Sequence, residues 1–341
     1  MIAASAIPTD ISSALALRCS AMPSSILVTS RIPSSVLTRL KTVGQVDLAT
    51  DHLTPAELRE RVSGKRALLC LTTDRIDAAV MDADCDLEII ANVAVGYDNI
   101  DLTAAASRGI SVTNTPGVLT EAVAELTWGM ILSVTRRMAE GDRLIRRNDW
   151  KGWALDFMLG MELSGKQLGI IGSGRIGRAV AARAPAFGME VAFASRSLET
   201  AGASAKGEMP LDELLVTSDV VSLHVPLTPE TRHLINRRTL ARMKRSAYLI
   251  NTARGPVVDE EALNWALEER LIAGVALDVF EREPEVHPGL LQRSNIVLVP
   301  HLGSATHETR VAMADLAARN VEAVLQGQPP LTPVVQADTK L

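Results

Sequence analysis

The sequence has few of the features that mark several large classes of protein. It contains three cysteines, Cys19, Cys70 and Cys85, without a CxxC pair, so we expect reduced thiols in a cytoplasmic protein rather than a disulfide framework. No apolar run reaches the ~20 residues of a membrane helix, and we expect neither a bilayer span nor a secretory signal. Lysine and arginine total 35 against 40 acidic residues, which leaves no broad basic surface for nucleic acid or membrane.

The motifs of several catalytic classes are absent as well. The sequence contains no GxSxG elbow and no phosphate-binding P-loop. His301 and His307 are six residues apart, a spacing that would place them on different faces of a helix, and no acidic cluster completes a ligand set. We therefore predict no metal site.

Hydrophobic residues, at 47% against 22% charged, are present in a regular pattern. From Ser25 on, short apolar runs such as ILVT and ALLCLTT alternate with amphipathic stretches, which is typical of a parallel sheet covered by helices. Thr54, Pro55 and Glu57 form a capping box that predicts the start of a helix. A longer pattern with apolar residues every three or four positions predicts one long helix over 120–147.

A second series of strands begins at KQLGIIGSG and continues through EVAFASRS, SDVVSLHVPL, AYLINTARG, VALDVFE and NIVLVPHLG. Six such strands make a doubly wound dinucleotide-binding sheet. We predict an α/β fold of two lobes, a Rossmann lobe over 119–303 and a smaller, flavodoxin-like lobe that binds substrate. The smaller lobe would be discontinuous, over 25–118 and 304–341, and residues 1–24 would be a mobile extension.

A glycine-rich loop follows the first strand of this second series. Strand, GxGxxG and helix come in the order of a dinucleotide site. Gly172 allows the tight turn, Gly174 lets the backbone approach a pyrophosphate, and Gly177 lets the helix pack on the strand. The alternative is a glycine-rich turn without a ligand. The expected cofactor contacts are Gly172, Ser173, Gly174, Arg175, Ile176 and Gly177.

The end of the next strand, over 190–194, carries the residues expected to select the cofactor. Ser195, Arg196 and Ser197 stand where an NAD-specific site usually has an acidic residue. A guanidinium and two hydroxyls can bind the 2′-phosphate of NADP, which a carboxylate would repel. We predict that NADP(H) is preferred, while use of NAD(H), with Arg196 in solvent, stays open.

Three polar residues, Arg254, Glu283 and His301, stand just past the ends of apolar strands. The carboxyl ends of parallel strands face the ligand crevice, so we expect these side chains to converge beside the nicotinamide. Taken singly, each has a structural alternative as a helix cap, a turn residue or a buried histidine with satisfied hydrogen bonds.

Several segments resemble the signature blocks of the D-isomer-specific 2-hydroxyacid dehydrogenases: ANVAVGYDNID, TNTPGVLTEAVAEL, GIIGSGRIG, NTARGPVVDEEAL, ALDVFEREP and VPHLGSAT. AVGYDNID, VTNTP and SRS most resemble the glyoxylate/hydroxypyruvate reductase branch. The resemblance implies that Arg254 binds the substrate carboxylate and polarises its carbonyl, that His301 delivers the proton, and that Glu283 pairs with the imidazole. The charges of these residues agree with the implied roles. A 2-oxo acid is an anion that the permanently charged Arg254 can bind, and the Glu283 carboxylate would favour the imidazolium form of His301.

The same resemblance implies further binding residues. For the cofactor they are Val225, Pro226, Thr252, Ala253, Asp278 and Gly303, with Asp278 at the nicotinamide carboxamide. His224 is expected to be structural or to line the cofactor. For the substrate, the resemblance implies a cradle of N–H groups from Val95 and Gly96, an apolar wall from Leu71, and contacts from Arg254 and His301. Tyr97 is expected to pack at the edge of this loop.

The segment from Trp150 to Trp153 resembles a loop that this branch places near a substrate site at the dimer boundary, although the following residues, ALDF, depart from the usual pattern. A core or interface role for Trp153 therefore stays open. A homodimer is expected, with the long helix after Thr120 as an interface element.

Together these features predict NADPH-dependent reduction of a small 2-oxo acid, glyoxylate to glycolate or hydroxypyruvate to D-glycerate. One alternative is a dehydrogenase of another D-2-hydroxy acid such as 3-phosphoglycerate, which would need more cations near Val95, where only Lys65, Arg66 and Arg75 are close in sequence. The other is a non-catalytic corepressor that senses NAD(P).

Overall fold

The computed structural model describes residues 25–83, 86–194 and 207–334. The predicted extension over 1–24 and the predicted cofactor-selecting residues Ser195, Arg196 and Ser197 lie outside these ranges. The chain divides into two compact units, one ending at Thr115 and resuming at Ala314, the other spanning Pro116–Met313. No helix among the described residues is long and apolar enough to cross a bilayer.

The first unit is built on five parallel strands in the order β2-β1-β3-β4-β5, the flavodoxin-like order. Its elements in chain order are β1 (Ser25–Val28), α2 (Ser34–Val43), β2 (Gln45–Leu48), α3 (Pro55–Val62), β3 (Ala67–Cys70), α4 (Ala78–Met81), β4 (Ile89–Asn92), α5 (Leu102–Ser107) and β5 (Ser111–Thr113), and α14 (His307–Leu325) belongs to this unit from Ala314 onward.

Alternate residues of these strands enter two separate cores. Ile26 and Val28 of β1 pack with α2 and α14, whereas Leu27 between them packs with α3, α4 and α5. Successive side chains of a strand point to opposite faces, and this sheet is covered on both. Strands covered on both faces are therefore continuously apolar, and this pattern predicted β1 and β3. The edge strand β2, with Gln45 and Asp47, lacks the pattern and was not predicted.

The predicted capping box at the start of α3 is confirmed. The Thr54 hydroxyl accepts a hydrogen bond from the Glu57 N–H at 3.3 Å, and the Glu57 carboxylate accepts one from the Thr54 N–H at 2.8 Å. Both N–H groups would otherwise lack an intrahelical partner.

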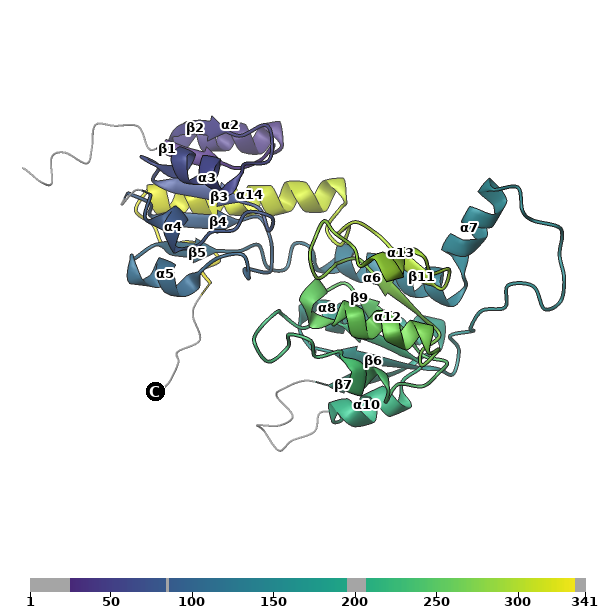
Figure 1. Ribbon diagram of the computed structural model, residues 1–341. Helices are drawn as coiled ribbons and strands as arrows, with labels where there is room; N and C mark the ends of the chain where they lie inside the picture. Colours follow the sequence, from purple (N-terminus) through teal and green to yellow (C-terminus); the bar gives the residue numbers. More distant parts are fainter. Residues whose placement is uncertain (1–24, 84–85, 195–206, 335–341) are drawn as a thin grey trace, which may run out of the picture. The chain divides into compact units, whose positions relative to one another are not determined.

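The second unit contains a six-stranded parallel sheet in the order β11-β10-β9-β8-β6-β7. An isolated parallel bridge between Phe193 and Glu208 extends it beyond β7. With Glu208 in the place of a third strand, the order becomes that of the doubly wound dinucleotide fold. The prediction of an α/β molecule with a Rossmann sheet and a second parallel sheet is confirmed (Figure 1).

Helices cover both faces of this sheet. Residues of α6 and α8 share one core with the strands, and residues of α10, α11 and α12 share the other. The elements are α6 (Thr120–Thr135), α7 (Met138–Arg146), β6 (Gln167–Ile171), α8 (Arg175–Arg183), the 3-10 helix η1 (Ala184–Phe187), β7 (Glu190–Ala194), α10 (Leu211–Thr217), β8 (Val220–Leu223), α11 (Arg237–Leu240), β9 (Tyr248–Asn251), η2 (Gly255–Val257), α12 (Glu260–Glu268), β10 (Gly274–Leu277), α13 (Pro288–Leu291) and β11 (Ile296–Leu298).

The prediction of one helix over 120–147 is wrong. The chain breaks between α6 and α7, where Arg137 adopts a left-handed conformation with φ 55°. The carbonyl of Thr135 accepts a hydrogen bond from the N–H of Met161 at 2.9 Å, so a segment from further along the chain takes the acceptor that a continuing helix would use. A Cβ atom on the adjacent Gly160 would lie 2.3 Å from the same oxygen.

Candidate active site

The glycine-rich loop has the geometry predicted for it. Gly172 has φ +102°, and a Cβ atom there would lie 2.6 Å from the carbonyl oxygen of His224. A Cβ atom on Gly177 would lie 2.1 Å from the carbonyl oxygen of Gly172, so this glycine lets α8 pack on the end of β6. Side chains are excluded at both positions.

Gly174 differs from its neighbours because a Cβ atom there would meet open space. It is the N-cap of α8, and no side chain caps that helix end. The N–H groups of the first turn and the positive end of the helix dipole are therefore available to an anion. Arg178, which the sequence analysis did not single out, holds the loop by donating from Nε to the Ser173 carbonyl at 2.7 Å. The loop fits the pyrophosphate of a dinucleotide.

The nearest acidic residue on β7 stands at the wrong end of the strand to bind a ribose. Glu190 opens β7 and pairs with Gln167 at the start of β6, while the glycine loop follows the other end of β6. The described part of β7 thus presents no carboxylate beside the loop.

His301 and Glu283 form a hydrogen-bonded pair. The Nδ1 atom of His301 lies 2.9 Å from one carboxylate oxygen of Glu283, and the other oxygen accepts from the Phe280 N–H at 3.0 Å. Burial alone would raise the pKa of Glu283, but the hydrogen bond and charge of His301 outweigh it, and the pKa lies below its usual range. Hydrogen bonds to an ionised carboxylate are shorter and stronger than those between neutral groups. Within the described residues, the Nε2 atom of His301 makes no hydrogen bond and is the nitrogen left for a substrate.

The loop that carries His301 is built on Asp278. The Asp278 carboxylate, 1% exposed, accepts hydrogen bonds from the N–H groups of Leu302 and Gly303, and its backbone carbonyl accepts from the His301 N–H at 2.8 Å. Burial raises the pKa of Asp278, and these N–H donors oppose the rise. Asp278 therefore shapes the His301 turn, a role that the sequence analysis did not predict for it.

Arg254 is held next to the turn that carries Glu283. Gly255, the next residue, packs so closely on Phe280 that a Cβ atom would lie 1.8 Å from its carbonyl oxygen. The charge of Arg254 also contributes to lowering the pKa of Glu283. The structure thus brings the loops of all three predicted catalytic residues together, through a glycine that the sequence analysis missed. Its position between Arg254 and Pro256 was the available signal.

In the first unit, the predicted substrate loops follow β3 and β4. The carbonyl of Val95 accepts from the Asn114 side chain and that of Gly96 from the Asn92 side chain, both at 2.8 Å. The N–H groups of Val95 and Gly96 donate to no atom of the described residues. Asn99 ties the Leu71 carbonyl to this loop at 3.0 Å. Pairing of the carbonyls leaves the N–H groups for an anion.

The three asparagines were not predicted as site residues. Each lies at or just after an apolar strand or turn, and a polar amide in such a place was the signal. Two of the three cations considered for a phosphorylated substrate are engaged elsewhere. Lys65 pairs with Asp47 at 3.2 Å and Arg66 with Glu88 at 2.6 Å, and both residues precede β3. The third, Arg75, is exposed and lies 3.9 Å from Asp77.

A model of the D-isomer specific 2-hydroxyacid dehydrogenase NAD binding domain matches residues 128–303, the part of the chain with the glycine loop and the His301–Glu283 pair. The chain belongs to the D-isomer specific 2-hydroxyacid dehydrogenase family. Members of this family are NAD(P)-dependent oxidoreductases, and so is this chain.

Relatives and solved structures support this membership. A glyoxylate reductase of Thermofilum pendens is 51% identical over 89% of this chain and 92% of its own length, and one of Korarchaeum cryptofilum is 46% identical over 93% and 97%. A crystal structure of an NADPH-dependent glyoxylate/hydroxypyruvate reductase from Sinorhizobium meliloti with NADP and malonate has a TM-score of 0.82 and 36% identity, covering 92% of this chain and 97% of that one. The predicted resemblance to the glyoxylate reductase branch is confirmed.

This dehydrogenase has a partly buried histidine, His224, beside the glycine loop. His224 Nε2 lies 2.9 Å from the Ser222 hydroxyl, while its Nδ1 atom is buried without a partner among the described residues. Burial lowers the pKa of His224 to about 3, so the ring is neutral at physiological pH. The neighbouring Thr252 hydroxyl, predicted at the cofactor, lies 3.0 Å from that of Thr127.

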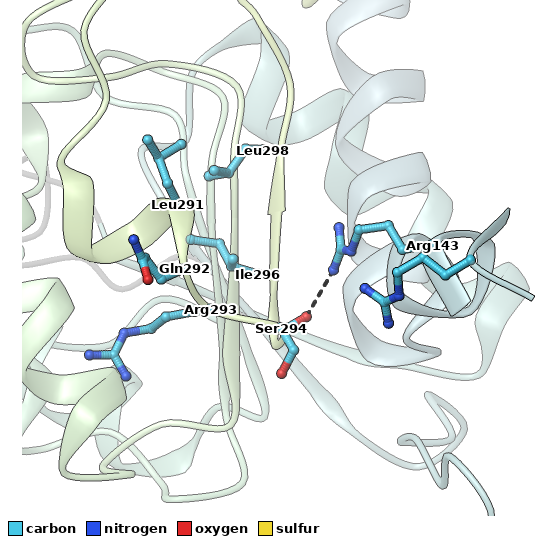
Figure 2. Close-up of a pocket in the computed structure, with 8 residues that line it drawn as sticks. Arg143, Leu291, Gln292, Arg293, Ser294, Ile296 and Leu298 are labelled. Atoms are coloured by element: carbon cyan, nitrogen blue, oxygen red, sulfur yellow. Dashed lines mark hydrogen bonds between the residues drawn. The ribbon is translucent and has the colours of Figure 1, made fainter. Parts of the chain in front are cut away.

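A pocket of about 340 Å³ in the dehydrogenase lies away from these loops (Figure 2). It lies between α7 and the segment that leads into β11, where Arg143 donates to the Ser294 carbonyl at 3.2 Å. None of the predicted site residues lines it. The described residues also hold no cluster of three metal-ligating side chains.

Proposed function

We propose that the protein reduces glyoxylate to glycolate, or hydroxypyruvate to D-glycerate, with NADPH. The observation that carries the proposal is the His301–Glu283 pair at 2.9 Å, on a loop of the unit that also holds the glycine loop. The names of the relatives in Thermofilum pendens and Sinorhizobium meliloti support the substrate class. The second unit would bind the cofactor and the first the substrate.

Each residue has a distinct part in this reaction. A nicotinamide supplies a hydride when bound. His301, protonated and held at Nδ1 by Glu283, donates a proton from Nε2 to the carbonyl oxygen of the substrate. Arg254, which is always charged, binds the substrate carboxylate and stabilises the developing alkoxide. In the first unit, the N–H groups of Val95 and Gly96 are proposed to bind a substrate anion, and the side chain of Leu71 to provide an apolar wall.

The remaining predicted contacts would hold the cofactor. The glycine loop, Gly172 to Gly177, binds the pyrophosphate, and Val225 and Pro226 lie on the adenosine side. Thr252, Ala253, Asp278 and Gly303 line the nicotinamide side. The preference for NADPH rests on Ser195, Arg196 and Ser197, together with the position of Glu190 at the far end of β7.

A spectrophotometric assay tests the proposed function. The purified protein is mixed with NADPH or NADH and a panel of 2-oxo acids, and nicotinamide absorbance is followed at fixed enzyme concentration. We expect rapid loss of absorbance with glyoxylate and hydroxypyruvate, faster with NADPH, and little with phosphorylated acids. Absence of turnover with every 2-oxo acid would instead favour the corepressor alternative.

The protein is proposed to act as a homodimer through α7 and the segment after it. Trp153 and Leu155 are 80% and 83% exposed, and Met138 and Ile145 of α7 are also exposed. Figure 1 shows α7 and the segment after it as an arm projecting from the body of the second unit. Apolar side chains gathered on an arm are typical of a surface that a second copy covers.

A further inference from the structure

A second histidine–glutamate pair lies close to the proposed catalytic pair of His301 and Glu283. The Nε2 atom of His233 lies 2.7 Å from a carboxylate oxygen of Glu281. Glu281 is two residues from Glu283, on the same turn. The family comparison and the sequence patterns assign neither residue a role in the reaction.

His233 is itself fixed in position by its backbone. It has φ 51°, in the left-handed region, which is uncommon for residues other than glycine. Its N–H donates to the Pro256 carbonyl at 2.8 Å, and the Ile235 N–H donates to the Val257 carbonyl at 3.0 Å. The segment of His233 therefore runs beside the residues that directly follow Arg254.

Glu281 is held from a second side by the start of α12. Its N–H donates to the Glu260 carboxylate at 2.7 Å, and its own carboxylate lies 3.4 Å from the Glu260 N–H. Arg232 is the remaining charged group nearby, with 3.8 Å between its guanidinium and the Glu281 carboxylate. Among these groups, His233 makes the shortest contact to the Glu281 carboxylate.

The two loops joined by His233 are those of Arg254 and Glu283. The backbone of His233 holds the first, and its imidazole holds the second through Glu281. Gly255 packs on Phe280 and on the N–H of Glu281 between them. A shift of Glu281 would therefore move the turn in which Phe280 and Glu283 are hydrogen-bonded.

We propose that His233 is a positioning residue, which holds Glu283 against His301 by clamping Glu281 to the loop of Arg254. The inference rests on the proposed reduction of a 2-oxo acid. Productive geometry at a reacting centre tolerates displacements of well under ~1 Å, so a support of this kind affects turnover rather than cofactor binding.

The test compares His233→Ala, which removes the imidazole, with His233→Gln, which keeps an N–H donor near the Nε2 position. We expect His233→Ala to lower kcat about tenfold or more, and His233→Gln to retain most of it. The Kd for NADPH, measured by fluorescence without substrate, should stay within about twofold of wild type in both. The high-pH fall of kcat/KM should move to lower pH in His233→Ala, because a displaced Glu283 favours the imidazolium of His301 less.

Glu261→Gln is the matched control. It removes another histidine–glutamate contact, 2.9 Å long and to His287, whose side chain bonds to neither Glu281 nor Glu283 among the described residues. We expect wild-type kcat and pH profile from this variant. Normal kcat in His233→Ala, an unshifted pH profile, failure of His233→Gln to recover turnover, or an equal defect in Glu261→Gln would overturn the proposal.

Hydrogen exchange separates this proposal from the proposed function. In His233→Ala the amides of residues 279–283 should exchange faster than in wild type, whether or not any 2-oxo acid is turned over, and unchanged exchange there would refute the clamp. If His233→Ala does not fold, Glu281→Gln provides the same measurements, because it keeps the shape of the side chain and removes its charge.

Discussion

His301, the proposed proton donor, has a strained backbone conformation. Its φ of 52° lies in the left-handed region, which costs a side chain with a Cβ atom roughly 1–2 kcal/mol. Asp278 compensates by binding the N–H groups of the two residues that follow. In this conformation Nδ1 of His301 lies 2.9 Å from Glu283. The buried Asp278 carboxylate therefore supports the geometry of the proposed proton donor.

Replacing Glu283 tests that link. Glu283→Gln keeps the size of the side chain and removes its charge, so imidazolium at His301 loses its partner. We expect kcat/KM for reduction to fall about ten- to a hundredfold at neutral pH, and more as pH rises. The measurement is a pH profile of kcat/KM beside NADPH affinity. A variant with normal kinetics would show that the carboxylate is structural.

His224 gives a prediction for the dependence of stability on pH. Its pKa is lowered from 6.5 to about 3 in the folded protein, so between these values the unfolded chain binds more protons than the folded one. The free energy of unfolding therefore falls as pH drops through this window, by up to about 1.4 kcal/mol per pH unit from this group. Urea denaturation at pH 7, 6, 5 and 4 should show a shallower fall for His224→Gln than for wild type. Parallel curves would contradict the assignment of a neutral His224 in the folded protein.

Arg196 carries the prediction on cofactor choice. In Arg196→Asp a carboxylate would repel the 2′-phosphate of NADP and accept hydrogen bonds from the ribose of NAD. Because a charge-assisted hydrogen bond contributes roughly 1.5–3 kcal/mol, we expect KM for NADPH to rise at least about tenfold more than KM for NADH. Equal changes in steady-state assays with the two cofactors would argue that Arg196 points into solvent.

At the scale of elements, turns rather than helices or strands align the proposed catalytic groups. η2, which follows Arg254, and the turn after β10 approach so closely that only a glycine fits at position 255. The hydrogen bonds of Asn92, Asn99 and Asn114 align loops in the first unit in the same way. These loops are supported by sheets, which restrict their movement.

Two glycine substitutions separate close packing from flexibility. Gly255→Ala places a methyl group 1.8 Å from the Phe280 carbonyl oxygen, and we expect it to destabilise the protein by at least about 2 kcal/mol and to reduce turnover. Gly129→Ala is the control, since the position lies on the exposed side of α6 with no atom near a Cβ. It should stabilise by up to about 1 kcal/mol. Thermal melts and assays of both variants provide the check, and a stable, active Gly255→Ala would refute the packing argument.

In the whole molecule, the two proposed binding functions belong to different parallel sheets. The sheet of the second unit carries the glycine loop for the cofactor, and the sheet of the first unit carries the N–H groups of Val95 and Gly96 for the substrate. The second unit also carries an arm whose apolar side chains find no cover within the described residues. We propose that a second copy of the chain covers these apolar side chains.

The proposed dimer predicts that the molecular mass in solution depends on the apolar side chains of the arm. Leu155 and Leu159 are 83% and 67% exposed, and replacing both with serine should weaken self-association about tenfold or more because apolar area is no longer buried. Light scattering on a dilution series measures the change. Leu331→Ser, an exposed leucine of the first unit, is the control. A wild-type protein that is monomeric at all concentrations would contradict the proposal.

Patterns among neighbouring residues were enough to predict the local features of this protein. Apolar runs that must be buried on both faces predicted strands such as β1 and β3, the spacing of three glycines predicted the loop, and the capping box predicted the start of α3. Features that depend on residues far apart in the chain became visible only in the folded structure. The break at Arg137 needs Met161, the His301 turn needs Asp278, and the place of Glu281 needs His233, because in each case a hydrogen-bond partner is supplied by another part of the fold.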